Sequence, residues 1–69
     1  MPQATDETRA LMEKWFGSID YGAPLEFLRS HGYLDIGGWL EKPTESHNIS
    51  EDEAACIAFL CDEWDFAFE

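Results

Sequence analysis

The charge of this chain is concentrated at one end, and any fold must accommodate it. No lysine or arginine follows Lys42, whereas residues 43–69 hold eight carboxylates and carry −8 of the formal net charge of −11. Like charge at this density opposes a compact fold, although it also favours solubility and a monomer. The acids therefore serve either solubility alone or contact with something cationic, such as a nucleic-acid-binding protein, a polyamine-like ligand or a metal ion. They are Glu45, Glu51, Asp52, Glu53, Asp62, Glu63, Asp65 and Glu69.

The length of 69 residues predicts a single domain over residues 1–69. A chain of this size buries only about 60% of its unfolded surface, so its core needs large side chains. Ten aromatic residues and a hydrophobic content of 45% meet that need and exclude a disordered acidic tail. No signal peptide or apolar stretch of roughly 20 residues is present, and Cys56 and Cys61 lack a disulfide framework. We expect a cytoplasmic protein with free thiols.

The first 42 residues predict two helices and an extended segment. The first helix spans residues 5–16, with Thr5 as its cap and Gly17 at its end. The second runs from Pro24 to Gly32, since proline suits a first helical turn and glycine a left-handed C-terminal cap. Residues 33–41 then form either a strand with a bulge or a tight hairpin that turns at Gly37–Gly38.

The second half predicts a helix and a strand. Ser50 and Glu53 match the S-x-x-E capping box, so a helix should span residues 51–61. Residues 63–69 alternate between apolar and polar side chains, which favours a half-buried strand, although apolar steps of three and four also fit a continued helix. The fold class is α+β, in the order helix, helix, strand, helix, strand. On the third helix, the expected buried stripe is Ala54, Ile57, Ala58 and Cys61, widened by Phe59 or Leu60.

The sequence offers little for catalysis or for metal binding. It has no nucleophile motif and no glycine-rich phosphate loop. His31 falls at a helix end, where a structural role is the common one. His47, Cys56 and Cys61 lack the spacing of a zinc site, and the acidic runs lack that of a calcium loop. We therefore expect neither an enzyme nor a cofactor. A small metal-responsive binding protein is a hypothesis that ranks third, behind two in which the acids bind a cationic protein surface.

The placement of the acids along the third helix is more informative. Three acids in its first turn suit the positive end of the helix dipole. Asp62 and Glu63 fall at the negative end, and Asp65 and Glu69 continue on the exposed side of the proposed strand, so these four work against local structure and suggest a function.

Spacing along the helix groups these acids into two clusters. Glu51 and Asp62 are eleven residues apart, as are Asp52 and Glu63, so each pair shares a helix face about 16 Å long. Proteins that hold DNA present rows of lysine and arginine to its phosphates, and two rigid acidic clusters would compete for such a row. A protein that competes with DNA in this way is a DNA mimic. An exposed Tyr21 or Trp39 would anchor the contact, but we expect both to be buried.

From MPQATDETRALMEKWF to the terminal CDEWDFAFE, the chain resembles the small acidic anti-CRISPR proteins of phages and mobile elements, specifically inhibitors of type I systems, type I-C included. The resemblance rests on overall sequence, size and charge. It implies a non-enzymatic inhibitor that binds a Cas protein of the surveillance complex and blocks target DNA binding. We expect the eight acids to meet a basic surface of that protein, without direct nucleic-acid contact. The alternative is an acidic phage or plasmid inhibitor of another DNA-binding protein, nuclease or toxin.

Overall fold

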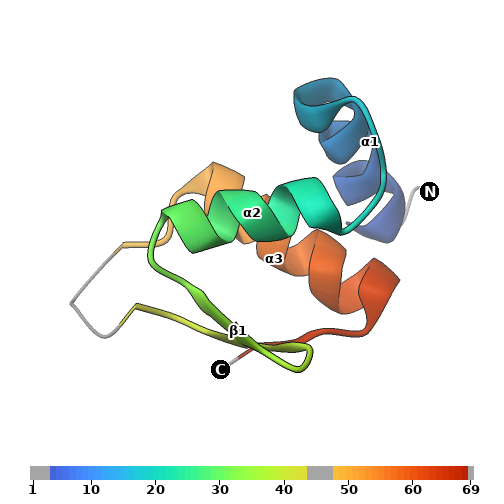
Figure 1. The fold of residues 1–69 in the computed structure, drawn as a ribbon. Helices are drawn as coiled ribbons and strands as arrows, with labels where there is room; N and C mark the ends of the chain where they lie inside the picture. Colours follow the sequence, from blue (N-terminus) through green and yellow to red (C-terminus); the bar gives the residue numbers. More distant parts are fainter. Residues whose placement is uncertain (1–3, 44–47, 69) are drawn as a thin grey trace.

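The computed structural model describes residues 4–43 and 48–68, and it confirms the α+β class. The three helices lie on one side of a small sheet (Figure 1). Glu45, His47 and Glu69 lie outside the described residues. The elements, in chain order, are α1 (Ala4–Phe16), α2 (Gly22–Ser30), β1 (Leu34–Ile36), β2 (Trp39–Glu41), α3 (Glu51–Trp64) and β3 (Ala67–Phe68).

Strands β1 and β2 form the hairpin that the sequence offered as one of two alternatives. They pair antiparallel, with Ile36 opposite Trp39. Gly37 and Gly38 form the two-residue loop and have φ angles of +57° and +88°, which a type I′ turn requires and which side chains with a Cβ rarely adopt. The hairpin adds one strand to the expected order. β3 then pairs parallel with β2, and α3 is the connection between these two strands.

The two N-terminal helices start earlier than predicted. The helix α1 begins at Ala4, so Thr5 lies inside it and is not its cap, and α2 begins at Gly22 instead of Pro24. The C-terminal end of α2 is as predicted. Gly32 has a φ of +92°, and the Tyr33 N–H donates to the Leu28 carbonyl at 3.1 Å, as in a Schellman motif. This turn directs the chain from α2 into the hairpin.

The capping box at the start of α3 is confirmed. The Ser50 hydroxyl accepts from the Glu53 N–H at 3.2 Å, and the Ser50 N–H donates to the Glu53 carboxylate at 3.1 Å. The predicted end of the helix at residue 61 is wrong, because α3 continues through Trp64, whose ring packs on Tyr21 with centroids 5.1 Å apart. The predicted strand over residues 63–69 is accordingly reduced to β3.

The core forms around α3, which packs against α1, α2 and β3, while α2 also packs against α1 and β1. The predicted buried stripe of α3 is partly wrong, because Ala54 is exposed and Ala58 and Cys61 are only partly buried. Larger side chains take the core positions, since they remove more apolar area from water than alanine does. The buried hydrophobic residues are Met12, Leu25, Leu28, Tyr33, Leu40, Cys56, Ile57, Phe59 and Leu60.

Glu53 is buried, contrary to the expectation that it faces a partner. Only 3% of the residue is exposed, and its carboxylate also accepts from the Ser50 hydroxyl at 2.9 Å. The buried hydroxyl of Tyr33 interacts with the same carboxylate. Burial, together with the interaction with the Glu53 carboxylate, raises the pKa of Tyr33 to about 12. Glu53 is therefore a structural residue that links α3 to the first residue of the hairpin segment.

Removal of the Tyr33 hydroxyl should destabilise the fold. In Tyr33→Phe the buried Glu53 carboxylate loses one donor, so the free energy of unfolding should fall by about 1–3 kcal/mol, as measured by urea denaturation. The control is Tyr21→Phe at an exposed ring, for which a change within about 0.5 kcal/mol is expected. Equal stability of Tyr33→Phe and the wild type would contradict a stabilising interaction between the Tyr33 hydroxyl and Glu53.

Stability should also fall at alkaline pH. Burial raises the pKa of Tyr33 from 10.0 to about 12 and that of Cys56 from 9.0 to about 12. The folded state therefore holds protons that the unfolded chain releases, so their contribution is complete below pH 9 and is lost as the pH rises toward 12. Denaturation midpoints measured across this range should decline, and the decline should be shallower in Tyr33→Phe. An identical slope in that variant would refute the coupling.

Candidate functional site

The solvent-facing side of α3 carries acids at both ends. Glu51 and Asp52 are exposed in its first turn, and Asp62 is exposed in its last turn beside the half-buried Glu63. All four lie in one continuous helix, so the predicted separation of about 16 Å between the two ends holds. Alanines fill the solvent side between them, and α3 contains neither lysine nor arginine. We call Glu51, Asp52, Asp62 and Glu63 the α3 acids.

The other predicted site acids are placed differently. Glu53 is buried in the capping box and cannot meet a partner. Asp65 is exposed, but it ends α3 in the left-handed conformation at a φ of +61° instead of continuing a strand. Aspartate tolerates this conformation better than most residues do. Its position after Trp64 adds a further carboxylate to the C-terminal end of α3.

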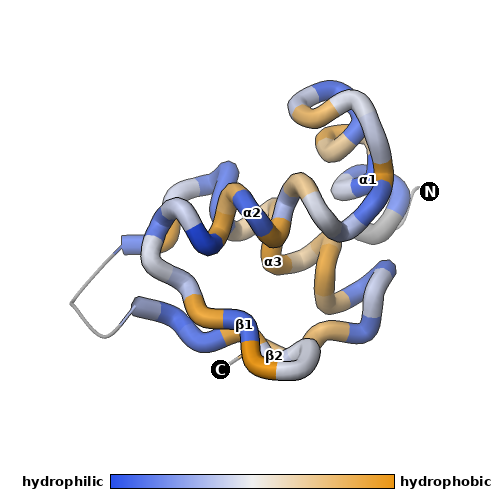
Figure 2. The backbone as a smooth tube through the Cα atoms, in the orientation of Figure 1, coloured by the Kyte–Doolittle hydropathy of each residue, from blue (hydrophilic) through white to orange (hydrophobic). Residues whose placement is uncertain are grey.

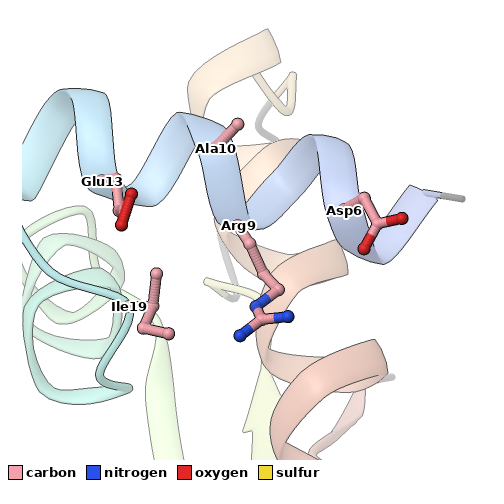
Figure 3. A pocket seen from close by; sticks show the side chains of 5 residues that line it. All are labelled: Asp6, Arg9, Ala10, Glu13 and Ile19. Atoms are coloured by element: carbon pink, nitrogen blue, oxygen red, sulfur yellow. The ribbon is translucent and has the colours of Figure 1, made fainter. Parts of the chain in front are cut away.

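Helix α1 adds charged residues that the sequence analysis did not include. The Arg9 side chain extends from α1 toward α3 between Asp6 and Glu13 (Figure 3), and its Nε lies 3.4 Å from the Glu63 carboxylate. These three residues, with Ala10 and Ile19, line a shallow hollow. Asp6, Arg9 and Glu13 are three and four residues apart in α1, so they lie on one face of the helix. This spacing is the sequence pattern from which the charged cluster could have been predicted. Arg9 also relieves the unfavourable charge of Glu63 at the end of α3.

Some of the few basic residues form ion pairs with acids of the same chain. Arg29 lies 3.2 Å from the Asp35 carboxylate and 3.9 Å from that of Glu26, while Arg9 is paired with Glu63. Within residues 4–43 and 48–68, Arg9 and Arg29 therefore neutralise acids of the same chain. Glu51 and Asp52 at the N-terminal end of α3 are exposed, as are Asp62 and Asp65 at its C-terminal end. The charge of these four acids therefore faces solvent.

The cysteines and His31 fit structural roles. Cys56 is fully buried, and burial raises its pKa to about 12; burial and the charge of Asp62 raise the pKa of Cys61 as well. Near neutral pH both thiols are protonated, which makes them poor nucleophiles. The Nδ1 atom of His31 lies 2.8 Å from the Phe27 carbonyl, and its ring packs against that of Phe27 in a tilted arrangement, which fits a structural role at a helix end.

Two further features follow from residues 4–43 and 48–68. Over these residues, no three His, Cys, Asp or Glu side chains gather closely enough to hold a metal ion. Each helix in the same part of the chain is too short or too polar to cross a membrane.

Comparison with known proteins places the chain in a family. No curated protein and no solved structure matches it. The model of a family described as "phage Pam3 gp59 related protein" matches residues 1–68, almost the whole chain. The protein with this acidic α3 surface therefore belongs to the phage Pam3 gp59 related family.

Proposed function

We propose that this phage-family protein is a non-enzymatic inhibitor that binds a lysine- and arginine-rich, DNA-handling surface of another protein in the cytoplasm of the host bacterium. The first candidate partner is a Cas protein of a type I surveillance complex, type I-C included, whose target DNA binding would be blocked. The observation that carries the proposal is the rigid, base-free helix α3 with exposed acids at both ends.

In this mechanism the carboxylates take the place of phosphates. Glu51 and Asp52 would meet basic side chains at one end of α3, and Asp62 with Asp65 would meet them at the other. Carboxylate pairs with arginine form strong, directional hydrogen bonds, while charge complementarity selects the partner and speeds association. Glu63 would contribute less, because Arg9 already neutralises part of its charge. The short alanine side chains between the two ends leave room for a long lysine or arginine to lie along the helix.

The alternative partner is another DNA-binding protein, nuclease or toxin that a phage or plasmid protein would inhibit. It requires the same acidic surface, and membership in a phage family supports either version. The two versions differ in the protein that is inhibited, so a defined complex must be tested.

Charge reversal on α3 should weaken inhibition of DNA binding. The wild type should displace duplex target DNA from a purified type I-C surveillance complex in a mobility-shift assay. Asp62→Lys and Glu51→Lys should each raise the half-inhibitory concentration roughly tenfold, because each replaces an attraction by a repulsion. The matched control is Glu26→Lys on α2, an exposed position with the same change in net charge, which should retain inhibition. Equal loss in Glu26→Lys would assign the effect to net charge alone, whereas no displacement by the wild type would exclude this partner.

The complex should also be sensitive to salt. Contacts between exposed charges are screened over about 10 Å at 0.1 M ionic strength and over about 3 Å at 1 M. Calorimetric titration of the same surveillance complex should therefore show an affinity that falls at least roughly tenfold between about 0.1 M and about 0.5 M NaCl. Asp62→Lys should have a shallower dependence than the wild type. An affinity that stays constant with salt would contradict an electrostatic interface.

A further inference from the structure

The face of the sheet that points away from the helices is apolar and exposed. Leu34 and Ile36 on β1 are 55% and 61% exposed, and Trp39 on β2 is 46% exposed. Pairing places Trp39 opposite Ile36 and beside Ala67 of β3, which is exposed as well. Figure 2 shows hydrophobic positions, in orange, along β1. We call Leu34, Ile36, Trp39 and Ala67 the outer sheet face. The expectation that Trp39 and Tyr21 are buried is wrong.

The alternation of β1 is the reverse of the usual pattern. Its central residue, Asp35, lies on the inner side, where the carboxylate accepts from Arg29 at 3.2 Å and from the Gly38 N–H at 3.3 Å. Leu40, which pairs with Asp35, is fully buried and fixes the orientation of the hairpin. The structure therefore directs the two aliphatic residues of β1 into water. Contiguous exposed apolar patches on soluble proteins mark interaction sites.

Two arguments select the occupant of this face. The exposed parts of three large side chains fall well below the roughly 800 Å² per partner of a standard stable interface, so further attraction is needed. A second copy would bring together two chains that each carry −11, which opposes association. A cationic partner instead gains from Glu41, which pairs with Leu34 in the sheet, and from the overall negative charge. Lys42, which directly follows β2, is exposed and offsets one of these negative charges.

We propose that the outer sheet face is a protein-docking surface whose occupant is a protein patch with an apolar centre and a lysine- and arginine-rich rim. Trp39 would act as the anchor, since tryptophan is enriched among the residues that dominate interface energetics. The inference adds an uncharged contact to the acidic surface of α3, and it rests on the proposed function only for the sign of the charge on the partner.

A pair of synthetic peptides tests this inference without knowledge of the natural partner. One peptide alternates leucine and lysine, and its twin alternates leucine and glutamate. In ¹H–¹⁵N correlation spectra of the wild type, the leucine–lysine peptide should shift the amides of residues 34–41 and 67 in a saturable manner, and the twin should not. Shifts confined to α3, or equal binding of both peptides, would overturn the inference.

Variants identify the side chains involved. Ile36→Ser combined with Trp39→Ser should weaken binding of the leucine–lysine peptide roughly tenfold or more. The matched control is Trp15→Ser combined with Ile49→Ser. These two residues are 37% and 38% exposed and lie outside the outer sheet face, so the control should bind the peptide as the wild type does. Circular dichroism checks the folding of both variants, and the wild-type shift map does not depend on it. Equal affinity of the sheet variant and the wild type would overturn the inference.

Self-association distinguishes the competing occupant. Sedimentation of the wild type should give a monomer at about 0.05 M and about 0.5 M NaCl. A dimer that the Ile36→Ser and Trp39→Ser changes dissociate would overturn the proposal and assign the face to a second copy. The two proposals also fail separately. If the wild type binds the leucine–lysine peptide but does not displace target DNA, the result contradicts the proposed function alone. If it displaces target DNA but does not bind the peptide, the result contradicts this inference alone.

Discussion

The buried carboxylate of Glu53 is the interaction on which the arrangement of this small domain depends. It closes the capping box with Ser50 at the start of α3 and binds the hydroxyl of Tyr33, which follows the C-terminal turn of α2. One side chain thus connects the longest helix to the segment that leads into the sheet. A buried charge is tolerated only when donors surround it, so each of these donors is needed for stability.

This connection positions two surfaces of different character. With its first turn held by Glu53, α3 directs Glu51, Asp52 and Asp62 to solvent, and Arg9 of α1 steadies Glu63 at the far end. With Tyr33 held by the same carboxylate, the hairpin buries Leu40 and leaves Ile36 and Trp39 outside. An acidic helix and an apolar sheet face in one rigid body complement a partner that has both basic and apolar contact residues. The first supplies attraction at a distance, and the second supplies burial on contact.

Local chemistry made several features predictable from sequence. The capping box, the turn at Gly37–Gly38 and the left-handed Gly32 each depend on a few adjacent residues, and all three are confirmed. The helical spacing of Glu51 and Asp62 was predictable for the same reason, because it follows from a regular geometry.

The errors fall where distant residues decide the outcome. The sequence of residues 63–69 fits both a strand and a helix. Contacts with Tyr21 and β2 accompany the outcome, in which Trp64 ends α3 and Ala67–Phe68 form β3. The burial of Glu53, the exposure of Trp39 and the pairing of Arg9 with Glu63 likewise depend on which elements pack together. No pattern within a single segment contains that information.

The short edge strands of the sheet limit the aggregation of a protein that has an exposed apolar face. Fibrillar aggregation usually proceeds by the addition of strands to an open edge. Here the two edge strands are β1, with three residues, and β3, with two, and β1 carries the charged Asp35 at its centre. Such edges offer an incoming chain too few backbone donors and acceptors to seed a growing sheet. A monomer with Trp39 exposed is therefore poorly able to start a fibril through these edges.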